Sequence, residues 1–233
     1  MEIVEQSNAD TVARWVGCSL LATIVVGVLA AVFLVSDIDI NLSADIAAVA
    51  ENMLEAEQRL RAKAYIALLT FGLDVLIAVG LFLILRSAGP LLAVWSLFVG
   101  LSASILVLLG AVFALNAAEF AGDRAYDTMA GDMRLTLASL QATSDYTSFH
   151  LGLILGSLAK AGFFYLFVKS RLIPALIAGW GLFASLFVAF AIVARDFVPV
   201  LGHEIVTAAF MISNLIALVS TGFYLGILGV RSR

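Results

Sequence analysis

The sequence is poor in two residue types that usually constrain a chain, with one cysteine and three prolines among 233 residues. The lone cysteine, Cys18, excludes an intrachain disulfide and lies in an apolar run, where a free thiol is usually a small packing group. Pro90 and Pro174 stand where apolar runs begin, and a helix does not need the N–H that proline lacks at its first position. We therefore expect long helices that these two prolines start and do not break.

Charge is scarce as well. Only 13% of the residues are Asp, Glu, Lys or Arg, and the formal net charge is -4. A chain with this balance offers no basic face to nucleic acid, so we expect no nucleic-acid partner. The sequence also lacks the G-x-S-x-G, Walker A and C-x-x-C motifs. We therefore assign no catalytic residue and no cofactor, and we expect a protein that is not an enzyme, with a membrane enzyme kept as a third possibility.

Apolar residues predominate in the chain. They account for 63% of the chain, and the mean hydropathy is +1.09. A soluble domain of this length cannot bury so much apolar surface, whereas a lipid bilayer can act as its solvent. Six apolar runs reach the length of roughly 20 residues that a hydrocarbon core of about 30 Å requires. We predict an all-α polytopic membrane protein, a single domain over residues 1–233, with a bundle of six membrane-spanning helices at 15–35, 65–85, 90–115, 149–168, 174–193 and 205–230.

The beginning of the chain does not read as a signal peptide. Glu2, Glu5 and Asp10 make the first ten residues acidic, whereas a signal peptide opens with positive charge. The apolar run after Arg14 is also longer than the apolar region of a signal peptide. We expect this run to be the first membrane helix.

The orientation follows from the short loops. Arg86 stands in the turn between the second and third runs, and Lys169 and Arg171 stand in the turn between the fourth and fifth. Basic residues in short loops remain on the cytoplasmic side of a membrane. We predict that both termini are cytoplasmic and that three loops lie outside.

Two of the outer loops have helical patterns of their own. In residues 41–63 apolar side chains such as Ile46, Val49 and Met53 recur at helical spacing, and residues 118–140 show a weaker version. These amphipathic segments either cap an outer opening of the bundle or rest on its top and in the membrane interface. We favour the second interpretation, because any amphipathic helix beside a membrane finds an apolar surface to rest on.

The two cytoplasmic turns resemble each other. A basic residue and a serine precede Pro90 and Trp95, and the same order precedes Pro174 and Trp180. The similarity is compatible with three parallel helical hairpins, since parallel repeats occur in transporters. We favour a simpler explanation, which is that any such turn needs a basic anchor, a helix start and an interfacial tryptophan.

Two charges interrupt the apolar runs. Asp74 lies about 13 Å below the outer end of the second run, and Lys160 about 16 Å below the outer end of the fourth, at 1.5 Å per residue. Asn214 lies about 13 Å down the last run, and Ser157 shares a helix face with Lys160. Charges at this depth are costly and are usually paired or functional. We predict an Asp74–Lys160 pair that either staples two helices together or forms a site for a proton or the charged end of an amphiphile.

Two histidines fall near the outer surface. His150 and His203 are weak metal candidates, because imidazole suits zinc or iron. No H-x-x-x-H or H-E-x-x-H spacing accompanies them. We therefore predict no metal site.

The region from Phe149 to Trp180 resembles the bacterial six-helix membrane proteins grouped as domain of unknown function 4386. The shared features are a histidine followed by glycines, an aromatic run, the turn at Lys169-Ser170, then Pro174 and further glycines. The opening Ala13-Arg14-Trp15-Val16-Gly17 is also similar to that family. The family's usual members carry a different stretch where this chain has Ser157 to Phe163, so Lys160 belongs to a subgroup. The resemblance implies a bacterial inner-membrane protein and transfers no activity.

Two functional hypotheses follow. In the first, the protein binds or moves a small amphiphile or a proton at a site around Asp74, Lys160, Asn214 and Ser157. In the second, it is a non-catalytic membrane module that acts through protein partners or self-association. The pairing surface would be either the outer helices or the glycine faces of two spanning helices, at Gly152 with Gly156 and at Gly222 with Gly226. The lipid bilayer is the partner common to both.

Overall fold

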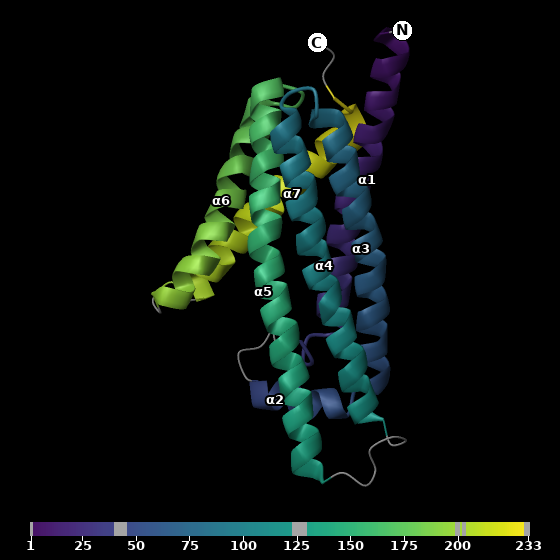
Figure 1. Cartoon of the computed structure of the whole chain (residues 1–233), viewed down its shortest axis with the longest axis vertical. Coiled ribbons are helices and arrows are strands. Elements are labelled where there is room, and N and C mark those ends of the chain that lie inside the picture. The colour runs from purple at the N-terminus through teal and green to yellow at the C-terminus, as the bar shows by residue number, and fades with distance from the viewer. Residues whose placement is uncertain (1, 40–45, 123–129, 199–200, 202–203, 231–233) are drawn as a thin grey trace. The chain divides into compact units, whose positions relative to one another are not determined.

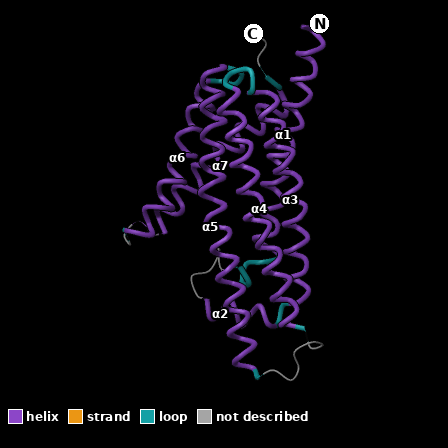
Figure 2. Tube along the Cα trace, viewed as in Figure 1, coloured by secondary structure: helices purple, strands orange, loops and turns teal. Residues whose placement is uncertain are grey.

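The computed structural model describes residues 2–39, 46–122, 130–198, 201 and 204–230. Helices and short turns account for these residues, and no strand is found among them (Figure 2). Six of the helices are long and apolar enough to cross a membrane, which confirms the predicted six-span polytopic fold. The helices are α1 (Glu2–Phe33), α2 (Ile46–Leu54), α3 (Glu57–Leu85), α4 (Pro90–Ala121), α5 (Gly131–Ser170), α6 (Ala175–Phe197) and α7 (Glu204–Leu228), as Figure 1 shows.

Five of the helices are longer than the apolar runs that predicted them. α1 begins well before Trp15, α3 begins before Tyr65, and α5 begins before Phe149, whereas α4 extends beyond Leu115 and α6 extends beyond Val193. The helix of 40 residues, α5, is about 60 Å long at 1.5 Å per residue, which is twice the thickness of a hydrocarbon core. Hydropathy predicts only the part of a helix that suits lipid, whereas backbone hydrogen bonding continues through polar residues.

The predicted amphipathic segments divide between helices. In residues 41–63, the first five lie outside the described residues, α2 takes 46–54, and α3 begins at Glu57 after a break at residues 55–56. In residues 118–140, the first four complete α4, and α5 begins at Gly131, with 123–129 outside the described residues.

Helix ends follow local rules. Pro90 is the first residue of α4, and Pro174 directly precedes α6. Arg171 and Gly229 have positive φ values of 56° and 71°, and each donates its N–H to the carbonyl four residues earlier. This is the left-handed cap that commonly ends a helix, and glycine adopts it without a steric penalty.

The chain forms two compact units. The first comprises residues 1–24, 73–104 and 153–233, and the second comprises residues 25–72 and 105–152. In the first unit, α6 and α7 lie side by side (Figure 1), and large apolar side chains such as Leu85, Phe167 and Leu225 fill the core. A Cβ on Gly17 of α1 would overlap the backbone N of Gly226 and lie 2.6 Å from the carbonyl O of Gly222, so glycine permits the close approach of α1 and α7.

The second unit is packed mainly with small residues. Ala111, Ala114 and Ala118 of α4 and Ala142 of α5 are buried in its core. The buried face of α2 contributes Val49, Ala50 and Met53. Small side chains let helix backbones come close, so the polar groups between them lie near one another.

Candidate functional site

The first unit gathers polar side chains from three membrane-spanning helices. Asp74 comes from α3, Lys160 from α5 and Asn214 from α7, and each is half-buried. The Lys160 ammonium donates a hydrogen bond of 3.4 Å to the side-chain oxygen of Asn214. The structure thus brings Lys160 and Asn214 into contact, although they are 54 residues apart in the chain.

Asp74 lies close to Lys160 without touching it. The two charges attract each other, but no ion pair of 4.0 Å or less joins them. The hydroxyl of Ser104 on α4 is a hydrogen-bonding neighbour of the Asp74 carboxyl. The carboxylate and the ammonium are therefore not in direct contact. The neighbour of Asp74 is the neutral Ser104 hydroxyl, and the neighbour of Lys160 is the neutral Asn214 amide.

Ser157 adds a buried hydroxyl to this part of α5. Its side chain is fully buried, and its Oγ has no hydrogen-bond partner among the residues that the structure describes. A helical serine usually satisfies its hydroxyl on the carbonyl one turn earlier, and a buried hydroxyl without a partner costs about 1–3 kcal/mol. Ser157 stands three residues before Lys160, so a donor without a partner lies one step from the ammonium on the same helix face.

Chemically, the group of Asp74, Ser104, Lys160 and Asn214 holds one acid, one base and two neutral hydrogen-bonding groups. We call these four residues the polar cluster. Such groups in a membrane-spanning segment can bind a proton, or complement the charged head of a small molecule. No cysteine or histidine belongs to the polar cluster, and no hydride-transfer or phosphate-binding motif accompanies it in the sequence.

The second unit contains a charged group that the sequence did not reveal. Lys63 of α3 bridges two acids, with its ammonium 2.6 Å from Asp145 of α5 and 3.1 Å from Asp39 in the segment that follows α1. The three side chains are only 12–16% exposed. We call Asp39, Lys63 and Asp145 the lysine triad.

A signal for the lysine triad is visible in hindsight on α5. Ala138, Ala142, Asp145 and Ser148 are all buried, and they recur at the spacing of one helix face. An acid within a buried stripe of small residues needs a partner. The sequence analysis did not single out Asp145, because its stripe carries small residues instead of large apolar ones.

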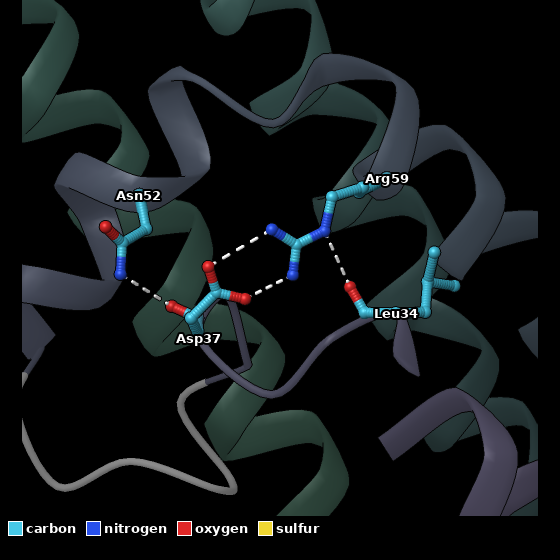
Figure 3. Close-up of polar contacts among 4 residues, drawn as sticks. All are labelled: Leu34, Asp37, Asn52 and Arg59. Carbon is cyan, nitrogen blue, oxygen red and sulfur yellow. Dashed lines mark hydrogen bonds and ion pairs between the residues drawn. The ribbon is translucent and has the colours of Figure 1, made fainter. Parts of the chain in front are cut away.

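A second polar contact in this unit is more exposed. Arg59 of α3 forms a two-pronged ion pair with Asp37 and donates a hydrogen bond of 2.8 Å to the carbonyl of Leu34 (Figure 3). The Asn52 amide of α2 donates a hydrogen bond of 3.0 Å to the backbone carbonyl of Asp37. The Arg59 guanidinium holds the pKa of the Asp37 carboxyl below its usual value. These contacts attach the end of α1, and with it α2, to the start of α3.

The histidines do not form a visible metal centre. His150 lies beside the ring of Tyr146, with 5.6 Å between ring centres, and His203 lies outside the described residues. Across the described ranges, no three His, Cys, Asp or Glu side chains are grouped so that they could hold a metal ion.

Comparison with known proteins gives one match. The model of the family described as domain of unknown function (DUF4386) matches residues 15–229. No curated protein and no solved structure matches the chain. The match confirms the resemblance predicted from the glycines, the aromatic run and the basic turn, and it covers nearly the whole sequence.

Proposed function

We propose that this chain, which belongs to the DUF4386 family, binds or moves a proton or a small amphiphile at the polar cluster. The description of the family, domain of unknown function, names no activity. Six apolar helices make the chain a multi-pass membrane protein. The family resemblance supports the inner membrane of a bacterium as its location. The basic residues of the short turns support a cytoplasmic position for both termini.

The open geometry of the polar cluster carries this proposal. A buried ion pair repays the cost of desolvating two charges only when the contact is direct and well satisfied. Asp74 and Lys160 attract each other but do not meet within 4.0 Å, so they are poorly placed to staple α3 to α5. A separated acid and base in one membrane-spanning unit are better suited to a guest that interacts with one or both of them.

Two residues of the polar cluster, and Ser157 beside it, have distinct roles in this proposal. Asp74 is the group that takes up a proton, because a carboxyl can change charge without leaving the site. Lys160 receives an anionic head, since its ammonium has one hydrogen bond to Asn214 and two donors to spare. Ser157 offers the same guest a hydroxyl donor.

Proton movement is tested in vesicles. The purified protein is reconstituted with a pH-sensitive dye trapped inside, and a potassium diffusion potential drives inward proton flow. We expect dye acidification faster than in empty vesicles, and we expect Asp74→Asn to abolish the excess rate. Ser102→Ala is the matched control, because Ser102 is exposed on the same helix as Ser104 and bonds only the carbonyl of Phe98.

Amphiphile binding is tested with a dansyl-labelled fatty acid as the probe. We expect saturable binding that weakens about tenfold or more in Lys160→Met, since a hydrogen bond to a charged group contributes about 1.5–3 kcal/mol. Asn214→Ala should weaken it less. If neither the proton flux nor the probe binding of Asp74→Asn and Lys160→Met differs from the unmodified protein, the polar cluster has no such function.

The alternative is a non-catalytic membrane module that acts through protein partners or self-association. Its sequence basis was the outer helices and two glycine pairs, Gly152 with Gly156 and Gly222 with Gly226. Three of these four glycines have neighbours inside the chain. Gly222 and Gly226 face α1, and a Cβ on Gly156 would lie 3.5 Å from that of Ala103 on α4. A homo-oligomer would need a different surface, and light scattering of the purified protein in mild detergent measures whether one forms.

A further inference from the structure

An apolar groove runs along the surface of the first unit, between α1 and α3. Val12, Trp15 and Val16 of α1 form one wall, and Leu76, Val79, Gly80 and Leu83 of α3 form the other. Its volume is about 400 Å³, and its lining is almost entirely apolar. Volumes of roughly 300–1,000 Å³ are typical of small-molecule sites.

Gly80 gives the groove its form. A Cβ at this position would overlap Val16, and it would lie 3.6 Å from a methyl carbon of Val12. The glycine therefore lets α1 approach the backbone of α3, while the larger side chains on both sides stand out as rims. Trp15 is the most prominent of these, with 63% of its surface exposed.

The position of the groove on membrane-spanning helices indicates that its ligand is a lipid chain. All seven lining residues belong to membrane-spanning segments, so the groove opens toward lipid unless another chain covers it. An acyl chain is long, flexible and apolar, and it forms no hydrogen bonds. It can therefore fill this groove without leaving a polar group of the lining unsatisfied. The lining by itself would accept a chain from any phospholipid.

Two arginines at one end of the groove add a preference. Arg86 follows the end of α3, three residues after Leu83 and on the same helix face. Arg14 precedes Trp15, and its Cα–Cβ bond tilts toward the start of α1. The start of α1 and the end of α3 lie at the same end of the first unit (Figure 1).

Both guanidiniums are available to a ligand. Arg14 and Arg86 are exposed, and neither makes an ion pair or side-chain hydrogen bond with any part of the chain that the structure describes. The carboxylate of Asp10, on the same stretch of α1, is occupied by the backbone N–H of Val230 at 3.2 Å. Arginine is well suited to phosphate, because its planar fork can donate two hydrogen bonds at once.

We propose that this groove is a binding site for one anionic phospholipid, whose acyl chain lies along Gly80 and whose phosphate group is bound by Arg14 and Arg86. The site is separate from the polar cluster and does not depend on the function proposed for it. It would fix α1 against α3 and orient the protein with its basic end at the anionic leaflet.

Trp15 provides a direct probe of the site. Trp95→Phe and Trp180→Phe leave Trp15 as the only tryptophan, and brominated phospholipids quench tryptophan fluorescence on contact. We expect brominated phosphatidylglycerol to quench Trp15 at lower membrane fractions than brominated phosphatidylcholine. The preference should fall about fivefold in Arg86→Gln and again in Arg14→Gln, since a basic residue near an anionic surface contributes about that factor.

Lys169→Gln is the control, because Lys169 is an exposed basic residue at another cytoplasmic turn and its removal changes the net charge equally. It should leave the lipid preference intact. Val79→Phe, which narrows the groove without changing charge, should reduce quenching by both lipids. Equal quenching by the two lipids in the unmodified protein would overturn the proposal, and so would an equal loss of preference in Lys169→Gln and Arg86→Gln.

Discussion

Lys63 and Lys160 are both lysines of long membrane-spanning helices, but they are bound in opposite ways. Lys63, in the second unit, makes ion pairs of 2.6 Å and 3.1 Å with two carboxylates. Lys160, in the first unit, makes a hydrogen bond of 3.4 Å with an amide oxygen and only attracts Asp74 from further away. One lysine is fully neutralised by its neighbours, and the other is not.

The difference is the one expected between a charge that stabilises the fold and the functional charge that we propose at Lys160. Two carboxylates around one ammonium repay its desolvation through direct contacts, and they connect the segment after α1 to both α3 and α5. The polar cluster has no such closed arrangement, so its charges contribute less to stability than those of the lysine triad. Uncompensated groups of this kind are found where a protein needs them for binding or proton transfer.

The largest expected effect is the loss of the lysine triad. Lys63→Met removes the ammonium that lies between the Asp39 and Asp145 carboxylates, which should lower the free energy of unfolding by about 3–5 kcal/mol. Lys160→Met should lower it by only about 1 kcal/mol, because it removes one long hydrogen bond. Both values are measured by unfolding in detergent followed by circular dichroism.

This pair of variants also tests the comparison itself. If Lys160→Met destabilised the protein as much as Lys63→Met, the polar cluster would be a staple after all, and the functional argument would lose its basis. Lys63→Arg should recover part of the stability, because it restores the charge with a different geometry.

An intermediate effect is expected from crowding the lysine triad. A Cβ at Gly110 of α4 would overlap the Asp145 carboxylate, so Gly110→Ala should push this acid away from Lys63 and cost about 1–3 kcal/mol. Gly100→Ala on the same helix is the control, since its Cβ would meet that of Ala159 at an ordinary 3.5 Å. Thermal unfolding of both variants in the same detergent gives the comparison, and equal melting temperatures would contradict it.

The smallest effect concerns the exposed pair of Asp37 and Arg59. Their side chains are 48% and 38% exposed, so the pair should contribute no more than about 1 kcal/mol. Because Arg59 lowers the pKa of Asp37 from 3.8, the contribution is present above that pH and disappears as the pH falls through the lower, folded-state value. Asp37→Asn should therefore be less stable than the unmodified protein near neutral pH and equally stable in acid. Unfolding curves across this pH range measure the difference, and a difference that persists in acid would show that the carboxylate charge is not its source.

The membrane fold could be predicted from the sequence because lipid imposes a simple rule. Each of the six spans needs an apolar run of sufficient length, and such runs are visible without any tertiary contact. The helix bounds were less predictable. Residues 57–63 and 131–140 were predicted to belong to separate amphipathic segments of the outer loops, but they are the first parts of the spanning helices α3 and α5, because the backbone keeps its hydrogen bonds through polar sequence.

Some candidate site residues could also be predicted from the sequence, and others could not. Asp74 and Lys160 stood out because a charge in an apolar run is conspicuous, and Asn214 joined them by depth. The lysine triad was missed because Lys63 and Asp145 lie in mixed, half-polar sequence, where a charge is ordinarily solvated. The groove at Gly80 was also out of reach, since one glycine among 18 has no special meaning until α1 lies against it.

The sequence by itself determined that this chain spans a membrane six times and that it belongs to the DUF4386 family, because hydropathy and motif order are properties of the chain alone. Only the tertiary structure decided which charges meet. Whether a lysine has two carboxylates at hydrogen-bonding distance or none depends on helix packing to within an ångström or two. No pattern along the sequence sets that distance, because it results from the small side chains through which separate helices approach one another.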